Sequence, residues 1–314
     1  MNQPLIRRTA RIGLVSAAAL MVLASCGGGS SSSATTVKNR TKNAALTTTT
    51  IEGDGTGTTD TTVAAEPTDT TVPAEAPTTT AAATTPEETP AATQVALSQS
   101  NGEGGDQFGG AVVLSEDGST LAVGALRSKS DQGSVTVFAR SGGKWVEQDV
   151  LSDANGSAKD WFGYSMAISK DGNTLAVGAV YADVSGKADQ GNVLVFSRAG
   201  GAWKLQKSLT SESGNAGDAF GLAVSLSADG NTLAVGAPGA DVKGVADQGS
   251  VIVFARSGAA WDQQQVLAAS SGAAKANFGS SVSLSSDGNT LAAGGPNAGK
   301  GSVLVFSRAN GTWS

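Results

Sequence analysis

Length, composition and charge limit what this chain can be. It has 314 residues, of which 15% are charged, and 21 Lys and Arg against 27 Asp and Glu give a formal net charge of -6. There is no histidine and only one cysteine. These counts exclude a Ser-His-Asp triad, a His-ligated zinc site and an intramolecular disulfide. The low, negative charge also argues against a nucleic-acid partner.

Residues 1–25 have the pattern of an export signal. Three arginines precede an apolar stretch at 12–24, which is too short to span a bilayer as a helix and is typical of a signal peptide. The stretch ends in Leu-Ala-Ser-Cys-Gly at 23–27, which resembles the lipobox of bacterial lipoproteins. That resemblance implies a lipid attached to Cys26. The alternative is an ordinary secretory signal with an incidental cysteine.

Residues 26–93 comprise Cys26 and a Thr/Ala/Pro-rich stretch without aromatic residues. Such a composition cannot bury enough apolar surface to offset chain entropy, so we expect a disordered tether. We therefore expect a protein that is exported and anchored to the outer face of the bacterial cytoplasmic membrane or held in the cell envelope. The eight Phe, five Trp and two Tyr all lie at or after Phe108, which places the folded domain at 94–314.

This last part of the chain contains four copies of one unit, with approximate bounds 94–145, 146–203, 204–261 and 262–314. Each copy has a Phe-Gly pair, an Asp-Gly turn, a Gly-(Ser/Asn)-Val-x-Val-Phe segment and a Trp. The Phe-Gly pairs begin at Phe108, Phe162, Phe220 and Phe278, with spacings of 54, 58 and 58. The alternation of β-branched and small residues predicts four short strands per copy. Four-stranded units at this period predict an all-β fold, a β-propeller of four four-stranded blades.

The segment before the first repeat aligns with the fourth strand of the later ones. Gln94 to Ser98 matches Gln148 to Ser152 at a constant offset of 54. The sequence therefore predicts that an N-terminal strand completes the last blade and closes the ring, which removes an unpaired strand edge.

The repeat resembles a known family. Leu-Ala-Val-Gly-Ala-Pro at 233–238, followed by Gly-Ser-Val-Ile-Val-Phe at 249–254, is similar to the FG-GAP repeat of bacterial surface proteins and integrin α chains. The resemblance implies a β-propeller. Propellers of this family commonly have seven blades, which leaves open a small four-bladed ring or a ring completed by a second chain.

Some integrin repeats carry a Ca²⁺ loop of the Asp-x-Asp-x-Asp-Gly type. Here that loop is shortened to Ser-x-Asp-Gly, as at 115–118, so we expect the Asp to hold a turn and expect no cofactor. The loops from Asp183 to Asp189 and from Asp241 to Asp247 are weaker candidates for Ca²⁺, because two carboxylates fall short of six to eight oxygen ligands.

Function is expected where the repeats differ. The second repeat has Trp161, Tyr164 and Tyr181 near Asp183, whereas Gln107, Ala219 and Asn277 occupy the position of Trp161 in the other repeats. We interpret these four residues as an exposed binding patch for a protein or glycan. The alternative is that the aromatic side chains cover loops locally.

The carboxylates show no asymmetric acid–base pair, and Asp160 and Asp218 recur with the repeat. We therefore expect no catalytic residues and a binding or scaffolding module, with the membrane as partner through its lipid anchor and an unknown protein or glycan as ligand. The runner-up is a carbohydrate-active hydrolase on the same fold.

Overall fold

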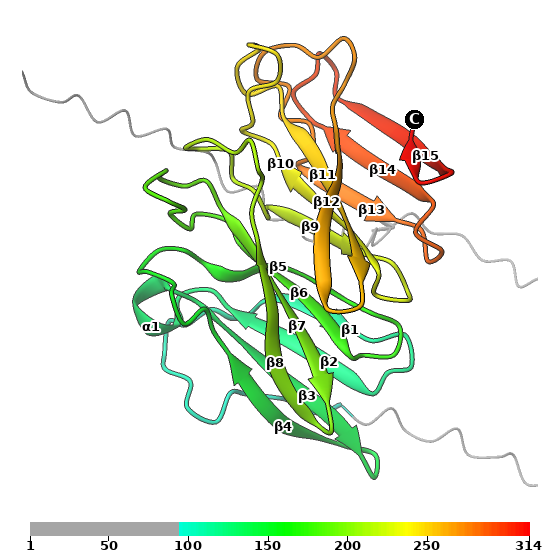
Figure 1. The fold of residues 1–314 in the computed structure, drawn as a ribbon. Coiled ribbons are helices and arrows are strands. Elements are labelled where there is room, and N and C mark those ends of the chain that lie inside the picture. The colour runs from blue at the N-terminus through cyan, green and yellow to red at the C-terminus, as the bar shows by residue number, and fades with distance from the viewer. Residues whose placement is uncertain (1–93) are drawn as a thin grey trace, which may run out of the picture. The chain divides into compact units, whose positions relative to one another are not determined.

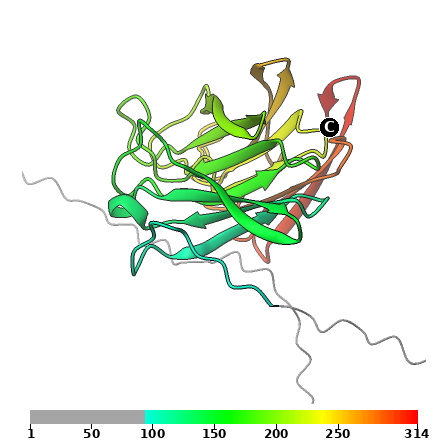
Figure 2. The ribbon, with the colours of Figure 1, turned by 90° about the horizontal axis from the view of Figure 1, so that it is seen from below.

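The computed structural model describes residues 94–314. The predicted signal peptide, the lipid site at Cys26 and the tether up to residue 93 lie outside the described residues. The described part is all-β apart from one short helical turn, and it contains four four-stranded antiparallel sheets, as the sequence predicts. The sheets follow one another along the chain and radiate side by side (Figures 1 and 2).

Each sheet is one blade, with its strands in chain order. Blade 1 comprises β1 (Phe108–Leu114), β2 (Thr120–Ala125), β3 (Ser134–Ser141) and β4 (Lys144–Leu151), with α1 (Ser128–Asp131) between β2 and β3. Blade 2 comprises β5 (Phe162–Ile168), β6 (Thr174–Ala179), β7 (Asn192–Ala199) and β8 (Ala202–Leu209). Blade 3 comprises β9 (Ala223–Leu226), β10 (Thr232–Ala237), β11 (Ser250–Ser257) and β12 (Ala260–Leu267). Blade 4 comprises β13 (Ser281–Leu284), β14 (Thr290–Gly295), β15 (Ser302–Ala309) and β16 (Thr312–Trp313).

The Ser-x-Asp-Gly segment forms the turn between the first two strands of each blade. In blade 1 the Ser115 hydroxyl donates to Asp117 Oδ1 at 2.5 Å, and the Ser119 N–H donates to the same oxygen at 2.9 Å. Gly118 follows with φ of +66°, a backbone conformation that favours glycine. The predicted structural role of the turn aspartate is confirmed, because the equivalent bonds recur in all four blades. These hydrogen bonds, led by that from Ser115, lower the pKa of Asp117 to about 2.

Neighbouring blades pack through three equivalent hydrophobic cores. We call the face of a blade that bears the phenylalanine of its Phe-Gly pair the leading face, and the opposite face the trailing face. In the core between blades 2 and 3, Phe220 of the leading face is fully buried against Val193 and Val195 of the trailing face before it. Phe162 and Phe278 are buried in the same way at the other two cores. The Phe positions therefore fill the space between blades, as predicted.

The backbones of neighbouring blades also approach closely at glycines. Gly191 has φ of +82°, and a Cβ placed on it would lie 2.1 Å from the carbonyl oxygen of Phe220 in the next blade. Gly133 and Gly249 meet the next phenylalanine in the same way, at 2.2 Å. A side chain at these positions would push two blades apart, which explains why the glycine recurs at the start of each Gly-(Ser/Asn)-Val segment.

A tryptophan secures the outer edge of each contact between blades. The indole N–H of Trp203 donates to Gln148 Oε1 of the preceding blade at 3.0 Å, and the Arg198 guanidinium lies 5.3 Å from the ring centroid. The same hydrogen bond joins Trp261 to Gln206 and Trp313 to Gln264. The predicted packing of tryptophan at blade edges is thus confirmed at three contacts.

The predicted closure by an N-terminal strand is not present. Residues 94–98 form no strand, and the outer partner of β15 is β16 alone. The segment is instead tied to blade 1, because the backbone N–H and the hydroxyl of Ser100 both donate to the Glu147 carboxylate. Among residues 94–314, hydrophobic cores join blades 1 and 2, 2 and 3, and 3 and 4, but none joins blade 4 to blade 1. The four blades therefore form an open series.

Candidate binding site on the second blade

The three aromatic residues singled out in the second repeat meet in space. Trp161 ends the loop before β5, Tyr164 lies within β5, and Tyr181 begins the loop after β6. The Trp161 ring stacks on that of Tyr164 with centroids 6.1 Å apart and an interplanar angle of 19°. It meets the Tyr181 ring edge to face at 5.1 Å and 78°. We call these three residues the aromatic cluster.

The cluster is less exposed than the sequence analysis expects. All three side chains are half-buried, because part of each ring is covered by its neighbours in the cluster. Burial raises the pKa of both phenols, and for Tyr181 the nearby Tyr164 and Asp189 add to the effect. Asp183 is exposed. The cluster thus offers partial ring surfaces rather than freely exposed rings.

The backbone conformation at the position of Trp161 is the same in every blade. Trp161 has φ of +55°, and its equivalents Gln107, Ala219 and Asn277 have φ between +52° and +55°. In blade 3, Leu222 and Gly239 take the places of Tyr164 and Tyr181. At this position blade 2 therefore differs in its side chain and not in its backbone conformation, and blade 3, whose loop 238–249 has the same length as loop 180–191, is its closest match without the aromatic cluster.

Asp183 helps to shape the loop beside the cluster. Its Oδ1 accepts the backbone N–H of Asp189 at 3.0 Å, and a tight turn between Val184 and Lys187 closes the loop. Asp241 accepts from Asp247 in the same way in blade 3, so this bond is a structural feature of both loops. Burial, and secondarily the charge of Asp183, raises the pKa of Asp189.

Asp160 lies directly before Trp161 and is buried. Its Oδ2 accepts the backbone N–H of Ser157 at 2.7 Å, and its carbonyl oxygen accepts the N–H of Tyr181 at 3.2 Å. Burial is the main cause that raises its pKa, and the charges of Asp153, Asp183 and Asp189 act in the same direction. The equivalent bonds of Asp218 in blade 3 support the predicted loop-building role. Together these carboxyl groups give the surroundings of the cluster an acidic character.

The described residues contain no group of three or more His, Cys, Asp or Glu that could hold a metal ion. Asp183 and Asp189 supply two carboxylates, and one oxygen of Asp183 is already engaged with the backbone. This arrangement falls short of the six to eight oxygen ligands that Ca²⁺ takes.

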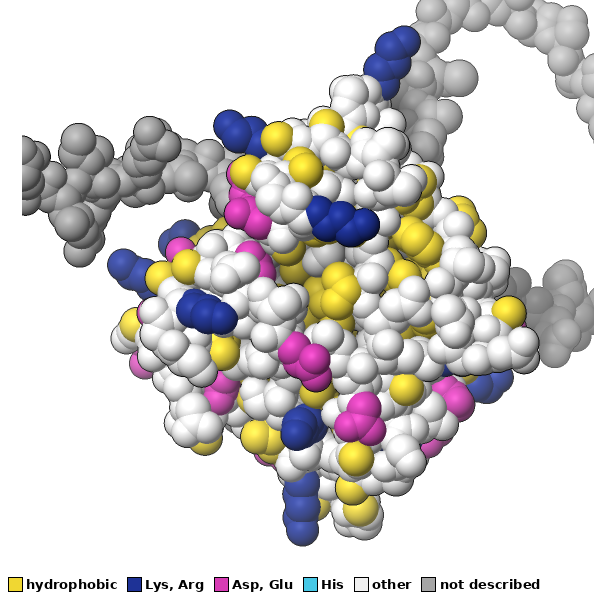
Figure 3. Space-filling model, turned by 45° about the horizontal axis from the view of Figure 1, so that its top comes forward, with side chains coloured by type: hydrophobic (Ala, Val, Ile, Leu, Met, Phe, Trp, Pro, Cys, Tyr) yellow, Lys and Arg dark blue, Asp and Glu magenta, His cyan; other side chains and the backbone are white. Residues whose placement is uncertain are grey.

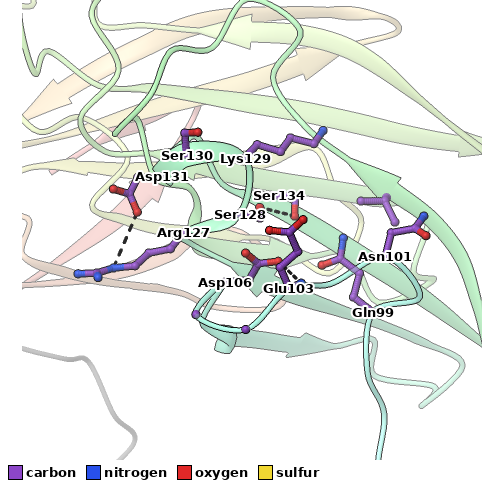
Figure 4. Close-up of a pocket in the computed structure, with 13 residues that line it drawn as sticks. Gln99, Asn101, Glu103, Asp106, Arg127, Ser128, Lys129, Ser130, Asp131 and Ser134 are labelled. Carbon is purple, nitrogen blue, oxygen red and sulfur yellow. Dashed lines mark hydrogen bonds and ion pairs between the residues drawn. The ribbon is translucent and has the colours of Figure 1, made fainter.

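A groove of about 770 Å³ lies at blade 1, at a place that the sequence analysis did not single out. Figure 4 shows it between the segment 99–106 and the loop that carries α1. Arg127 and Lys129 line it together with Glu103, Asp106 and Asp131, so charges of both signs face the same space. The one feature of the sequence that could have pointed to this groove is the loop at 126–133, which is shorter than its counterparts in blades 2 and 3.

A second depression, of about 580 Å³, is lined by the four turn aspartates, Asp117, Asp171, Asp229 and Asp287. Each of these carboxylates is engaged within its own turn, which leaves them fixed by the fold. On the face seen in Figure 3, hydrophobic side chains gather near the middle and charged side chains are scattered around them. In residues 94–314, no helix has the length and apolar character needed to cross a membrane.

The comparison with protein families agrees with this architecture. Three segments match the FG-GAP repeat, at 145–196, 203–254 and 261–306. Each match begins at the tryptophan in the fourth strand of one blade and ends near the phenylalanine in the third strand of the next. A sequence repeat therefore links two blades. Three segments of the chain thus match FG-GAP repeats, which supports an FG-GAP β-propeller.

Solved structures show more distant likenesses. TolB from Acinetobacter baumannii is 13% identical, with a TM-score of 0.37, over 65% of this chain and 42% of TolB. Hydrazine synthase from Kuenenia stuttgartiensis is 20% identical, with a TM-score of 0.42, over 64% of this chain and 46% of the enzyme chain. The matched part thus spans less than half the length of either protein. No curated protein matches this chain.

Proposed function

We propose that the domain is a binding module that recognises a glycan or protein ligand through the aromatic cluster of blade 2 and the adjacent Asp183. The observation that carries this proposal is that Trp161 and Tyr164, from one segment of the chain, meet Tyr181 from another. They meet on a scaffold whose other blades have small, aliphatic or polar residues at the position of the tryptophan. A repeated scaffold with one distinct blade gives a localised site rather than a repeated one.

The chemistry of the cluster suits such ligands. Half-buried tryptophan and tyrosine rings offer flat apolar surface with little conformational entropy to lose, and an indole or phenol can also hydrogen bond. The free oxygen of Asp183 can accept a hydrogen bond from a sugar hydroxyl, a peptide N–H or an ammonium group. The acidic surroundings disfavour an anionic ligand.

A hydrolytic function is the weaker proposal. The carboxylate next to the cluster, Asp160, already accepts a hydrogen bond from the Ser157 N–H. Asp218 makes the equivalent bond in blade 3, which has no aromatic cluster. We propose that the module acts without a catalytic step or cofactor. We further propose that it is exported, anchored by a lipid at Cys26 and carried on the stretch 27–93, as a surface propeller in the manner that the integrin resemblance implies.

The test is a binding screen with the full chain. Immobilised bacterial envelope polysaccharides and envelope proteins are probed with the wild type, with Trp161→Ala and with Leu222→Ala. Alanine is already accommodated at the Trp161 backbone position, as Ala219 shows in blade 3. We expect a ligand whose affinity falls at least about tenfold in Trp161→Ala, which is about 1.4 kcal/mol, and stays unchanged in Leu222→Ala. Binding that is equal in all three proteins would refute the proposal.

A further inference from the structure

Two blade faces have no partner blade among the described residues. On the trailing face of blade 4, Val303 and Val305 are 67% and 64% exposed. Their equivalents in blade 1, Val135 and Val137, are completely buried against blade 2. On the leading face of blade 1, Val112 is 67% exposed. The same repeat positions thus change from core to surface at the two ends of the series.

The polar groups at these two ends are also complementary. The Arg256 guanidinium donates to Thr174 of the preceding blade, and Arg308 donates to Thr232 in the same way, both at 3.1 Å. By the repeat, the corresponding pair for the open ends is Arg140 of blade 1 and Thr290 of blade 4. Thr290 is exposed, whereas Thr174 and Thr232 are buried.

The glycine of each Phe-Gly pair also identifies the faces that match, because it lies against a valine of the preceding blade. A Cβ placed on Gly163 or on Gly221 would lie 3.0 Å from a methyl group of the valine in the preceding blade, Val135 or Val193. The equivalent residues at the open ends are Gly109 and Val303. A Cβ on Gly109 meets nothing within 4 Å, so the space that a trailing face fills at the other blades is empty here.

One chain does not bring these two faces together. The three internal contacts repeat equivalent hydrophobic positions and the tryptophan–glutamine hydrogen bond. Among residues 94–314, no equivalent core joins blade 4 to blade 1. Within the described residues no further leading face is available to the trailing face of blade 4, and a second copy of this chain supplies one with the same residues.

We propose that a second copy of this chain covers both faces. The trailing face of blade 4 in each copy packs on the leading face of blade 1 in the other, so that two chains form one closed ring of eight blades. Two heterologous contacts related by a two-fold axis close such a ring, and eight blades lie within the range known for propellers. Charged residues at the exposed valine positions should therefore separate the two chains.

The test uses the full chain with Cys26 replaced by Ser, so that introduced thiols alone react. We expect light scattering to give twice the chain mass of 30.9 kDa, and Val303→Asp to reduce it to the single-chain mass. Val146→Asp is the matched control, because Val146 is also exposed but is equivalent to the exposed Lys204 and Asp262. Its mass should stay that of the dimer. A wild type of single-chain mass would overturn the proposal.

Cross-linking distinguishes a second copy from closure within one chain. Gly109→Cys combined with Val303→Cys should form a disulfide between two chains, seen as a covalent dimer without reductant. Gly163→Cys combined with Val135→Cys is the control for geometry and should cross-link within one chain. A disulfide within one chain for the first pair would overturn the proposal in favour of a four-bladed ring, and a ladder of larger species would overturn the closed dimer.

Discussion

The contact at Gly191 gives the sharpest prediction about what holds the blades together. Gly191→Ala adds one methyl group at the boundary between blades 2 and 3. That carbon would lie 2.1 Å from the carbonyl oxygen and 2.7 Å from the backbone nitrogen of Phe220. Since both atoms belong to the backbone of a buried residue in the next blade, relief requires the two blades to move apart.

The magnitude follows from two separate costs. A non-glycine residue at φ of +82° costs about 1–2 kcal/mol, and overpacking of a close contact costs about 1–3 kcal/mol more. Gly244→Ala is the matched control, because Gly244 has φ of +81° but nothing within 4 Å of the added carbon. We expect Gly191→Ala to lose about 2–5 kcal/mol of unfolding free energy, and Gly244→Ala about 1–2 kcal/mol.

The assay is denaturant unfolding followed by tryptophan fluorescence, with circular dichroism as a second probe. Trp203 and Trp261 lie at the edges of blade contacts, so their fluorescence reports the separation of blades. Equal losses in the two variants would show that backbone conformation alone matters at Gly191, and would refute the claim that blades are held at contact distance there.

Three further predictions concern the contacts between blades and the turn aspartate. Phe220→Ala should cost about 3–5 kcal/mol of unfolding free energy, because the ring is fully buried. Phe108→Ala should cost clearly less in the single-chain state, because that ring is half-buried. Equal losses of the two variants in chemical denaturation would contradict this prediction. The hydrogen bonds that lower the pKa of Asp117 to about 2 stabilise the fold at pH values above its ordinary pKa of 3.8. This contribution should disappear as the pH falls from about 4 to 2. Carboxyl NMR titration should find the low pKa, and an ordinary pKa would refute the prediction. Trp203→Phe should lose about 1 kcal/mol in thermal or denaturant unfolding, since Gln148 then loses its indole donor. The double variant with Gln148→Leu should lose more, because the same oxygen also accepts from Arg198; a double variant as stable as the wild type would contradict this.

The fold was largely predictable because the repeat carries it in local signals. The Ser-x-Asp-Gly turn, the alternation in each strand and the recurring Phe, Gly and Trp each specify a contact that the structure contains. The closure was not predictable in this way. The match of Gln94 to Ser98 with a fourth strand identified a possible strand sequence, but whether it pairs depends on how far three blade contacts rotate the chain.

The site was predictable only in part. The sequence showed that Trp161, Tyr164 and Tyr181 are unusual among the repeats, and the repeat alignment placed them near one another. It could not show that the rings cover one another, because that depends on side-chain directions at the left-handed Trp161, in β5 and in the loop after β6. The groove beside Arg127 was missed, since it is formed where the segment 99–106 meets the loop at 126–133, and no motif marks that meeting.

The measurement that tests the central claim most directly compares the wild type with a variant in which the aromatic cluster takes the residues of blade 3. This variant, Trp161→Ala with Tyr164→Leu and Tyr181→Gly, keeps residues that the same scaffold already accommodates in blade 3. Its affinity for the ligand found in the binding screen is measured by titration calorimetry, and its melting temperature is measured alongside. We predict a loss of binding by at least about tenfold with a melting temperature within a few degrees of the wild type. Full binding by this folded variant would contradict the assignment of function to blade 2.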